Sequence, residues 1–249
     1  MLAGQHGLCE CKSPRIQKAV QLLRERIVGE LYMAKSLCYK RRKSIGQVPN
    51  GVDYNLWLGP APKRPFNPNR FHYNWHWFWD TGNGDIGNQG VHEMDVARWG
   101  LGKSGLPRKV HSSGGHFVYD DDQETPTTQM ATFEYGDCQL VFEVRGLLTK
   151  GEADLVFNGQ SFVGNIFFGS EGVMVVDSTG FGVYLGEKHE LAQELSYQDS
   201  RVWECQPLVA NFLKAVQTRD VERLTCDIEE GHLSAALCHM AHISYRLGR

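Results

Sequence analysis

The apolar residues of the chain recur first at helical spacing and then at strand spacing. In residues 13–28 they follow Ser13, a capping residue, and Pro14, which suits a first helical turn. This pattern predicts a helix over 13–28 and then a strand over 30–39. Residues 46–70 are rich in Pro, Gly and Asn, which predicts a long ordered loop or linker.

Between 108 and 185 the chain reads as a series of short strands separated by glycine-containing turns. Residues 129–135 and 138–144 flank Gly136 and Asp137 and predict a hairpin. Further short strands are expected at 154–157, 161–168, 172–176 and 182–185. A meander of this kind forms an antiparallel sheet that leaves one face available for packing.

Helical spacing returns near the C-terminus, over 207–216 and again after Asp227. Asp227 is followed three positions later by Glu230, which is a capping-box pattern. The order of these elements predicts an α+β fold, with an open, mostly antiparallel β-sheet and helices packed on one face.

Composition and charge exclude several classes of protein. The 249 residues carry a net charge of -3 and are 41% hydrophobic, an ordinary globular mix with room for one large or two small domains. No overall basic charge would recruit nucleic acid, and no apolar run reaches the roughly 18–20 residues that cross a bilayer. We therefore expect neither a nucleic-acid partner nor a membrane partner.

Seven cysteines are scattered along the chain, and no C-x-x-C pair occurs. The spacing therefore gives no sign of a zinc ribbon or a thioredoxin-like motif. Reduced thiols in a reducing compartment are the simplest interpretation, so a cytoplasmic location is expected.

The densest chemistry lies in residues 71–99, where three of the six tryptophans fall at alternate positions from 75 to 79. His72, His76 and Asp80 are spaced by four, which would place them on one face of a helix or a strand. A metal site and a packed aromatic cluster are two interpretations. The favoured one is an aromatic-walled polar pocket that stacks rings on a sugar and binds its hydroxyls, built from His72, His76, Trp77, Trp79 and Asp80.

Residues 82–87 match the G-x-G-x-x-G pattern of dinucleotide-binding loops literally. Such a loop needs a strand before it, a helix after it, and an acidic residue at the end of the next strand. The residues before Gly82 make a poor buried strand, and no such second strand follows. We therefore expect these glycines to shape a tight turn into the next helix.

That helix is expected over 88–99, with Asn88, His92, Asp95 and Trp99 on one face. A histidine is a natural general base because its unperturbed pKa is about 6.5. We predict that His92 has this role and that Asp95 orients its ring. A surface or capping histidine is the structural alternative.

Residues 85–95, DIGNQGVHEMD, resemble the D-x-G-x-H-x-x-D motif of the Gfo/Idh/MocA oxidoreductases. The aromatic block before them and residues 122–126, DQETP, are similar to a sugar-dehydrogenase-like branch. The resemblance implies an N-terminal Rossmann domain that holds NAD(P), followed by an α/β domain whose open sheet binds substrate and builds the oligomer. It also implies that His92 is the acid/base at the substrate hydroxyl. Asn88 stands where the motif usually has Asp.

Two features of that family are not found in the sequence: the initial G-x-G-x-x-G strand–turn–helix and the E-K-P segment with the catalytic lysine. We therefore expect 1–30 to be a remnant strand and helix of a Rossmann domain, and 31–249 to form the substrate-binding and oligomerisation domain. No cofactor is expected, unless a Rossmann domain that binds NAD(P) is supplied.

Three functions are compatible with these patterns. The first is a cofactor-independent hydrolase or lyase acting on a sugar derivative, with His92 and Asp95 catalytic and with Asn88 positioning the substrate. Lys40 and Arg42 would bind an anionic group of it. The second is a fragment of an NAD(P)-dependent sugar dehydrogenase that is inactive alone. The third is a non-catalytic binding or assembly module. The expected partners are a carbohydrate-like small molecule and further copies of the chain, bound through the sheet face.

Overall fold

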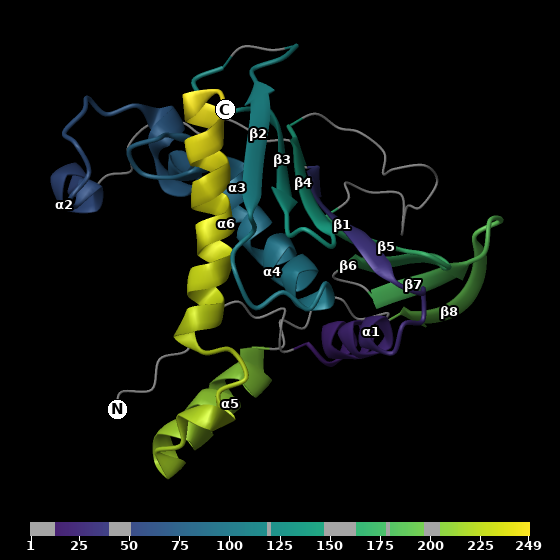
Figure 1. Ribbon diagram of the computed structural model, residues 1–249. Coiled ribbons are helices and arrows are strands. Elements are labelled where there is room, and N and C mark those ends of the chain that lie inside the picture. The colour runs from purple at the N-terminus through teal and green to yellow at the C-terminus, as the bar shows by residue number, and fades with distance from the viewer. Residues whose placement is uncertain (1–12, 40–50, 119–120, 147–162, 178–179, 197–204) are drawn as a thin grey trace.

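The computed structural model describes residues 13–39, 51–118, 121–146, 163–177, 180–196 and 205–249. Its centre is an eight-stranded sheet in the order β2-β3-β4-β1-β5-β6-β7-β8 (Figure 1). Neighbouring strands are antiparallel except for β1 and β4, which are parallel. The strands are β1 Leu31–Tyr39, β2 Lys109–Gly115, β3 Thr128–Glu134, β4 Gln139–Arg145, β5 Val163–Gly169, β6 Gly172–Asp177, β7 Gly180–Leu185 and β8 Glu190–Ser196.

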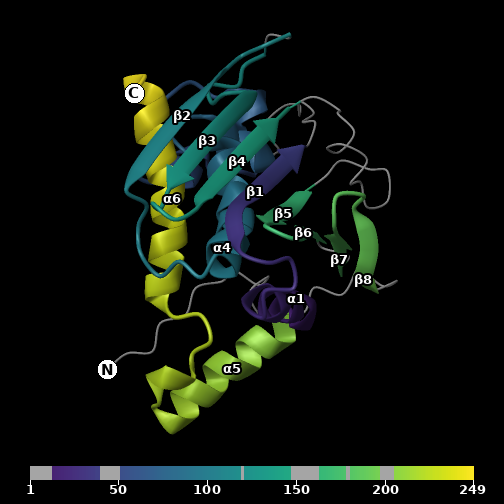
Figure 2. The ribbon, with the colours of Figure 1, turned by 45° about the vertical axis from the view of Figure 1, so that its right-hand side comes forward.

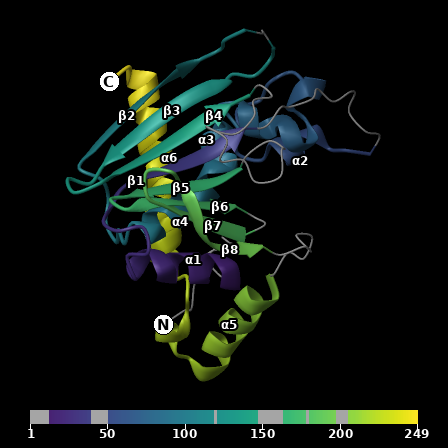
Figure 3. The same cartoon turned by 90° about the vertical axis from the view of Figure 1, so that its right-hand side faces the viewer.

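Helices α1, α4 and α6 lie on one face of this sheet, and α5 lies away from it (Figures 2 and 3). The predicted α+β fold with helices on one face of an open, mostly antiparallel sheet is therefore confirmed. The helices are α1 Pro14–Arg24, α2 Tyr54–Leu58, η2 Pro68–Arg70, η3 His72–Trp77, α3 Gly84–Asn88, α4 Gly90–Gly100, α5 Cys205–Thr218, η4 Val221–Arg223 and α6 Ile228–Leu247.

The main core lies between the sheet and these helices. Alternate residues of the strands point into it, so that Phe142 of β4 and Phe167 of β5 are fully buried. Gly90 and Gly100 begin and end α4, and a Cβ at either position would overlap one of these two rings. The two glycines therefore let α4 approach the sheet closely.

Helix α1 buries its apolar face in the same core, through Ile16, Ala19 and Leu23 among others. It ends at Arg24, earlier than expected, because the chain turns and Arg26 adopts a left-handed conformation with φ of 60°. The division into a Rossmann remnant at 1–30 and a domain at 31–249 stays a prediction, and residues 1–12 lie outside the described part of the chain.

The expected continuous helix over 88–99 is wrong. Asn88 ends the short helix α3, Gln89 separates the two elements, and α4 begins at Gly90. The expected loop at 46–70 contains α2 and η2. The strand predicted at 154–157 lies outside the described residues, and β2 and β8 were not predicted as individual strands.

The other face of the sheet carries a second, smaller apolar cluster of Leu37, Ile166, Val173 and Val175. Beside it, Lys35 Nζ lies 2.8 Å from Glu143 Oε2, and Arg145 also pairs with Glu143. Burial alone would raise the pKa of Glu143, but the bonds from Lys35 and Arg145 outweigh it and lower that pKa.

The cysteines do not share one chemical state. Cys38, Cys138 and Cys238 are buried and form no disulfide, whereas Cys226 is disulfide-bonded. The expectation of reduced thiols throughout is therefore wrong at Cys226. Within the described ranges, none of the helices combines the length and the apolar character that crossing a membrane requires.

Candidate functional site

The residues from α2 to Thr81, here called the aromatic segment (54–81), form short helices and turns beside α3. Residues 72–77 adopt a 3₁₀ helix, in which residues three apart share a face and residues four apart do not. Asp80 lies beyond this helix in a turn. His76 and Asp80 therefore do not share a helical face, contrary to the expectation from their spacing, and the side chain of His72 lies outside the described part.

Tyr73 is the centre of a polar and aromatic group, the Tyr73 group, made of Tyr73, His76, Trp77 and Asn88. The Tyr73 ring lies 4.6 Å from that of His76 and 5.7 Å from that of Trp77, centroid to centroid. Asn88 Nδ2 donates to the Tyr73 hydroxyl at 3.2 Å. Three residues that the sequence proposed for substrate binding are thus brought together around a tyrosine that it did not propose.

The two ring partners of Tyr73, the Trp77 indole and the His76 imidazole, are fixed in orientation. Trp77 is buried, and its Nε1 donates to Asp85 Oδ2 at 3.2 Å. His76 Nδ1 lies 2.5 Å from the Tyr73 carbonyl oxygen, so the tautomer with a proton on Nδ1 donates there and has Nε2 as its acceptor. Tyr73 itself is 51% exposed, which leaves its ring accessible to a ligand.

His92 is half-buried in the first turns of α4, and its amide donates to the Gln89 carbonyl at 3.0 Å. Asn88 precedes it by four residues across the break at Gln89. Asp95 is buried and accepts from Ser234 Oγ at 2.5 Å and from Arg98 Nη2 at 3.4 Å. The Ser234 bond ties α4 to α6, the Arg98 bond lies within α4, and neither includes His92.

Trp79 packs toward α6, away from the Tyr73 group. Its ring meets that of His242 edge-on at 5.0 Å and lies 5.2 Å below the Arg246 guanidinium. The His242 Nε2–H donates to the Asn83 carbonyl at 2.5 Å, and burial lowers the pKa of His242 to about 4. The imidazole is therefore neutral at pH 7 and joins α6 to the turn before α3.

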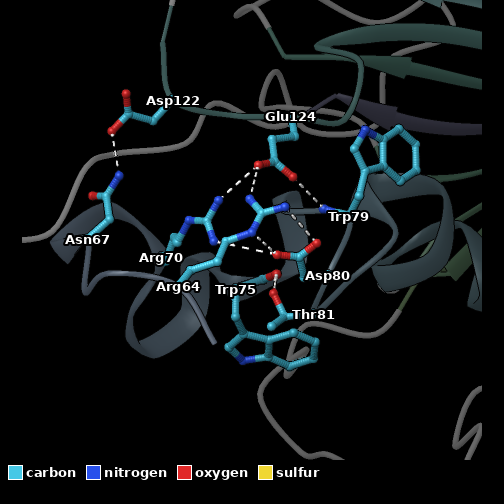
Figure 4. Close-up of polar contacts among 9 residues, drawn as sticks. All are labelled: Arg64, Asn67, Arg70, Trp75, Trp79, Asp80, Thr81, Asp122 and Glu124. Carbon is cyan, nitrogen blue, oxygen red and sulfur yellow. Dashed lines mark hydrogen bonds and ion pairs between the residues drawn. The ribbon is translucent and has the colours of Figure 1, made fainter. Parts of the chain in front are cut away.

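Four charged residues, the Arg–acid cluster of Arg64, Arg70, Asp80 and Glu124, hold the end of the aromatic segment (Figure 4). Arg64 donates to Asp80 Oδ1 and to Glu124 Oε1, each at 2.8 Å. Arg70 donates to Glu124 Oε1 at 2.9 Å. Two positive and two negative groups thus compensate each other around Asp80.

Glu124 also accepts the Trp79 amide, at 2.9 Å. Burial would raise the pKa of Glu124, but the bonds from the Trp79 amide and from Arg64, together with the two guanidinium charges, lower it. The residues of this cluster come from positions up to 60 apart in the chain, so sequence spacing gave no sign of it.

A pocket of about 420 Å³ lies between α2 and the turn that contains Asp80, and it is called the aromatic pocket below. Of the predicted substrate-binding residues, Asp80 lines it. Its other lining residues are Trp57, Leu58, Pro60, Ala61, Pro62, Trp75 and Thr81.

A model described as the C-terminal alpha/beta domain of the Gfo/Idh/MocA oxidoreductase family matches residues 35–162, which is just over half of the chain. The chain belongs to this oxidoreductase family. No curated protein matches its sequence.

Solved structures share the fold of this oxidoreductase chain. The WlbA dehydrogenase from Bordetella pertussis, in complex with NADH and UDP-GlcNAcA, matches 100% of the chain at 15% identity and a TM-score of 0.64. The aldose–aldose oxidoreductase from Caulobacter crescentus, complexed with glycerol, matches 99% of the chain at 10% identity and a TM-score of 0.68. Levoglucosan dehydrogenase, in complex with NADH and levoglucosan, matches 100% of the chain at 11% identity and a TM-score of 0.65.

The oxidoreductase chain spans 63%, 63% and 65% of the length of those three proteins, less than two thirds of each. At these identities the likeness shows the fold alone. The activity, the substrate and the partners of the whole protein are therefore matters for proposal.

The glycines at 82–87 do not form a dinucleotide-binding loop. Gly82, Gly84 and Gly87 pack so closely on His76, Thr125 and Asn83 that an added Cβ would overlap them, which leaves no open backbone cradle for phosphates. The helix that follows Asn83 has five residues only. Nor do three His, Cys, Asp or Glu side chains gather as metal ligands in the part of the chain that the structure describes.

Two predicted residues, Lys40 and Arg42, lie outside the described residues. The residues that the sequence analysis missed are Tyr73, Trp57 and Trp75. The position of Tyr73 could have indicated its role, because it precedes His76 by three residues and residues three apart share a face of a 3₁₀ helix. Trp57 carried none, since it precedes Trp75 by 18 positions in a proline-rich stretch.

Proposed function

We propose that this chain is the substrate-binding part of a nicotinamide-dependent dehydrogenase that acts on a carbohydrate. The observation that carries the proposal is the Tyr73 group, whose Asn88 precedes His92 by four residues in a chain of an oxidoreductase family. The three neighbouring structures named above support the substrate class, because two of them contain a sugar or a sugar nucleotide.

In this proposal His92 accepts the proton of the substrate hydroxyl that is oxidised. An imidazole is the side chain that most often acts as a general base, and that of His92 is half-buried in α4. The Tyr73 ring offers its exposed face to the apolar side of a sugar ring. Asn88 uses its amide nitrogen on Tyr73, so that its carbonyl oxygen is positioned to accept from a sugar hydroxyl.

Asp95 is assigned a positioning role rather than a catalytic one. Its bond from Ser234 joins α4 to α6, as does the pair between Arg98 and Glu230, and these contacts fix the helix that carries His92. The dinucleotide is assigned to another part of the whole protein, because the described glycines leave no cradle for it. This chain then contributes substrate contacts and proton transfer.

Hydrolase or lyase action without a cofactor, the first function considered from the sequence, finds no support in the family or in the three named neighbours. A cytoplasmic location stays a prediction.

We also propose that the chain self-associates through the sheet face opposite the helices. Tyr32 and Met130, which are 54% and 43% exposed, are apolar strand residues that such an interface would bury. Light scattering is expected to report a dimer or larger species that Met130→Lys dissociates. A monomer at all concentrations would contradict this part.

The proposal is tested by exposing the chain to neutral pyranosides, including levoglucosan, and to acidic nucleotide sugars. Binding is followed by saturation-transfer NMR, and cofactor-free turnover by mass spectrometry. We expect binding without turnover, weakened about fivefold by Asn88→Ala because one hydrogen bond is lost. His239→Ala, at an exposed histidine of α6, serves as the control and keeps full affinity.

Turnover of a sugar without cofactor, abolished by His92→Ala and kept by His239→Ala, would instead establish a hydrolase or lyase. Failure of every sugar to bind would also contradict the proposal.

A further inference from the structure

The aromatic pocket is separated from the Tyr73 group by a single indole ring. Trp75 lines the pocket and also stacks on His76, with ring centroids 3.6 Å apart and planes inclined by 20°. The pocket contains neither His92 nor Asn88 among its lining residues. The function proposed above therefore does not use it.

Both tryptophans of the pocket are held in place by contacts with neighbouring rings. Trp57 stacks on Tyr54 at 5.6 Å with an interplanar angle of 17°, and it also contacts Phe71 at 5.2 Å. Trp75 has His76 against its ring and is still 36% exposed. Two rings that are already ordered lose little conformational freedom when a ligand stacks on them.

The polar edge of the pocket consists of Asp80 and Thr81. The Asp80 carboxylate is oriented by Arg64, and the Thr81 hydroxyl donates to the Trp75 carbonyl at 2.8 Å. A hydroxyl that donates its proton within the protein presents an acceptor to a ligand, as a carboxylate does. The edge therefore suits a ligand that brings hydroxyl donors.

The charge balance selects among ligands. Tryptophan rings with an uncompensated carboxylate would suit a quaternary ammonium ion. Here Arg64 and Arg70 offset the charges of Asp80 and Glu124, so the surroundings of the pocket favour neither a cation nor an anion. A volume of about 420 Å³ lies within the range of small-ligand pockets.

We propose that the aromatic pocket binds one neutral sugar ring, stacked on Trp57 and Trp75 and hydrogen-bonded to Asp80 and Thr81. This inference concerns binding alone and does not depend on the dehydrogenase function. If both proposals hold, Trp75 lies between two sugar sites, and a disaccharide that reaches both binds more tightly than either of its units.

The test measures sugar binding by isothermal titration calorimetry, with maltose and cellobiose as neutral probes and with glucuronate and choline as charged ones. Ala61→Leu fills the aromatic pocket without removing a ring contact. We expect it to abolish sugar binding in this pocket. Trp57→Ala is expected to weaken binding about tenfold through loss of the stacked face. Leu56→Ala is the matched control, because Leu56 lies on the same helix and is 80% exposed.

Circular dichroism of each variant establishes that α2 and the fold are retained. Binding of a neutral disaccharide that Ala61→Leu removes and Leu56→Ala keeps would support the inference, whatever Asn88→Ala does. Equal binding in Ala61→Leu and the original chain, or tighter binding of choline than of any neutral sugar, would overturn it. Loss of binding in Asn88→Ala alone would place the sugar at the Tyr73 group instead, which separates the two proposals.

Discussion

In the sheet layer, Phe142 and Phe167 are fully buried against α4, whereas in the aromatic segment Tyr73 and Trp75 are 51% and 36% exposed. The sheet layer is stabilised by apolar burial, which does not depend on the direction of individual side-chain contacts. The second is held by the Arg–acid cluster and by ring stacking, which fix individual side chains. This difference explains how the segment keeps aromatic faces available to a ligand.

Removal of a core ring is expected to have the largest effect. Phe142→Ala deletes a fully buried ring between β4 and α4 and should lower the free energy of unfolding by about 3–5 kcal/mol in urea titrations. Leu56→Ala, at an 80% exposed position of α2, is the control and should change it by less than about 1 kcal/mol. Similar effects in both variants would contradict the location of the core.

The next effect is a dependence of stability on pH through His242, which joins α6 to the turn before α3. Its pKa is about 4 in the folded chain and about 6.5 when unfolded, so the unfolded chain binds the extra proton between these values. Stability should therefore fall as pH falls from 6.5 to 4, by up to about 3 kcal/mol.

Denaturant titrations at several pH values measure this slope in the chain and in two variants. His242→Gln should flatten it, whereas the control His232→Ala, at an exposed histidine of the same helix, should leave it unchanged. An equally steep slope in His242→Gln would show that other groups cause the acid sensitivity.

Loss of one charge of the Arg–acid cluster should have a smaller and more local effect. Glu124→Gln removes the charge that Arg64 and Arg70 share, at an estimated cost of about 1–2 kcal/mol. Amide hydrogen exchange in 71–81 should then accelerate by about tenfold, while the strands keep their protection. Glu134→Gln removes an exposed pair with Lys109 and should accelerate neither region.

Unchanged exchange in Glu124→Gln would mean that stacking alone holds the aromatic segment. Equal acceleration in the strands would mean that the two regions unfold as one unit.

The comparison also explains which elements could be predicted. Strands predicted at 129–135 and 138–144 lie within one residue of β3 and β4, because their alternation reflects burial of one face. Strand β2, with the sequence KVHSSGG, carries little apolar alternation and was not predicted as a strand. The break at Gln89 was missed because helical spacing continues across it.

The site was only partly predictable for the same reason. The sequence placed His76 and Trp77 in an aromatic-walled pocket and Asn88 on the polar face of the next helix, and the structure gathers these three around Tyr73. Asp80 was grouped with them by spacing, but its partners Arg64 and Arg70 precede it by 16 and 10 positions. Ion pairs over such distances leave no periodic pattern in a sequence.

The central claim is that the Tyr73 group and His92 form a sugar-binding site in this chain. Amide chemical-shift mapping during a titration with levoglucosan tests it most directly. We predict shifts confined to 72–77 and 84–92, reduced by Asn88→Ala and unchanged by His239→Ala. Shifts that avoid both of these stretches, or that are equally large in Asn88→Ala and in the unchanged chain, would contradict the account.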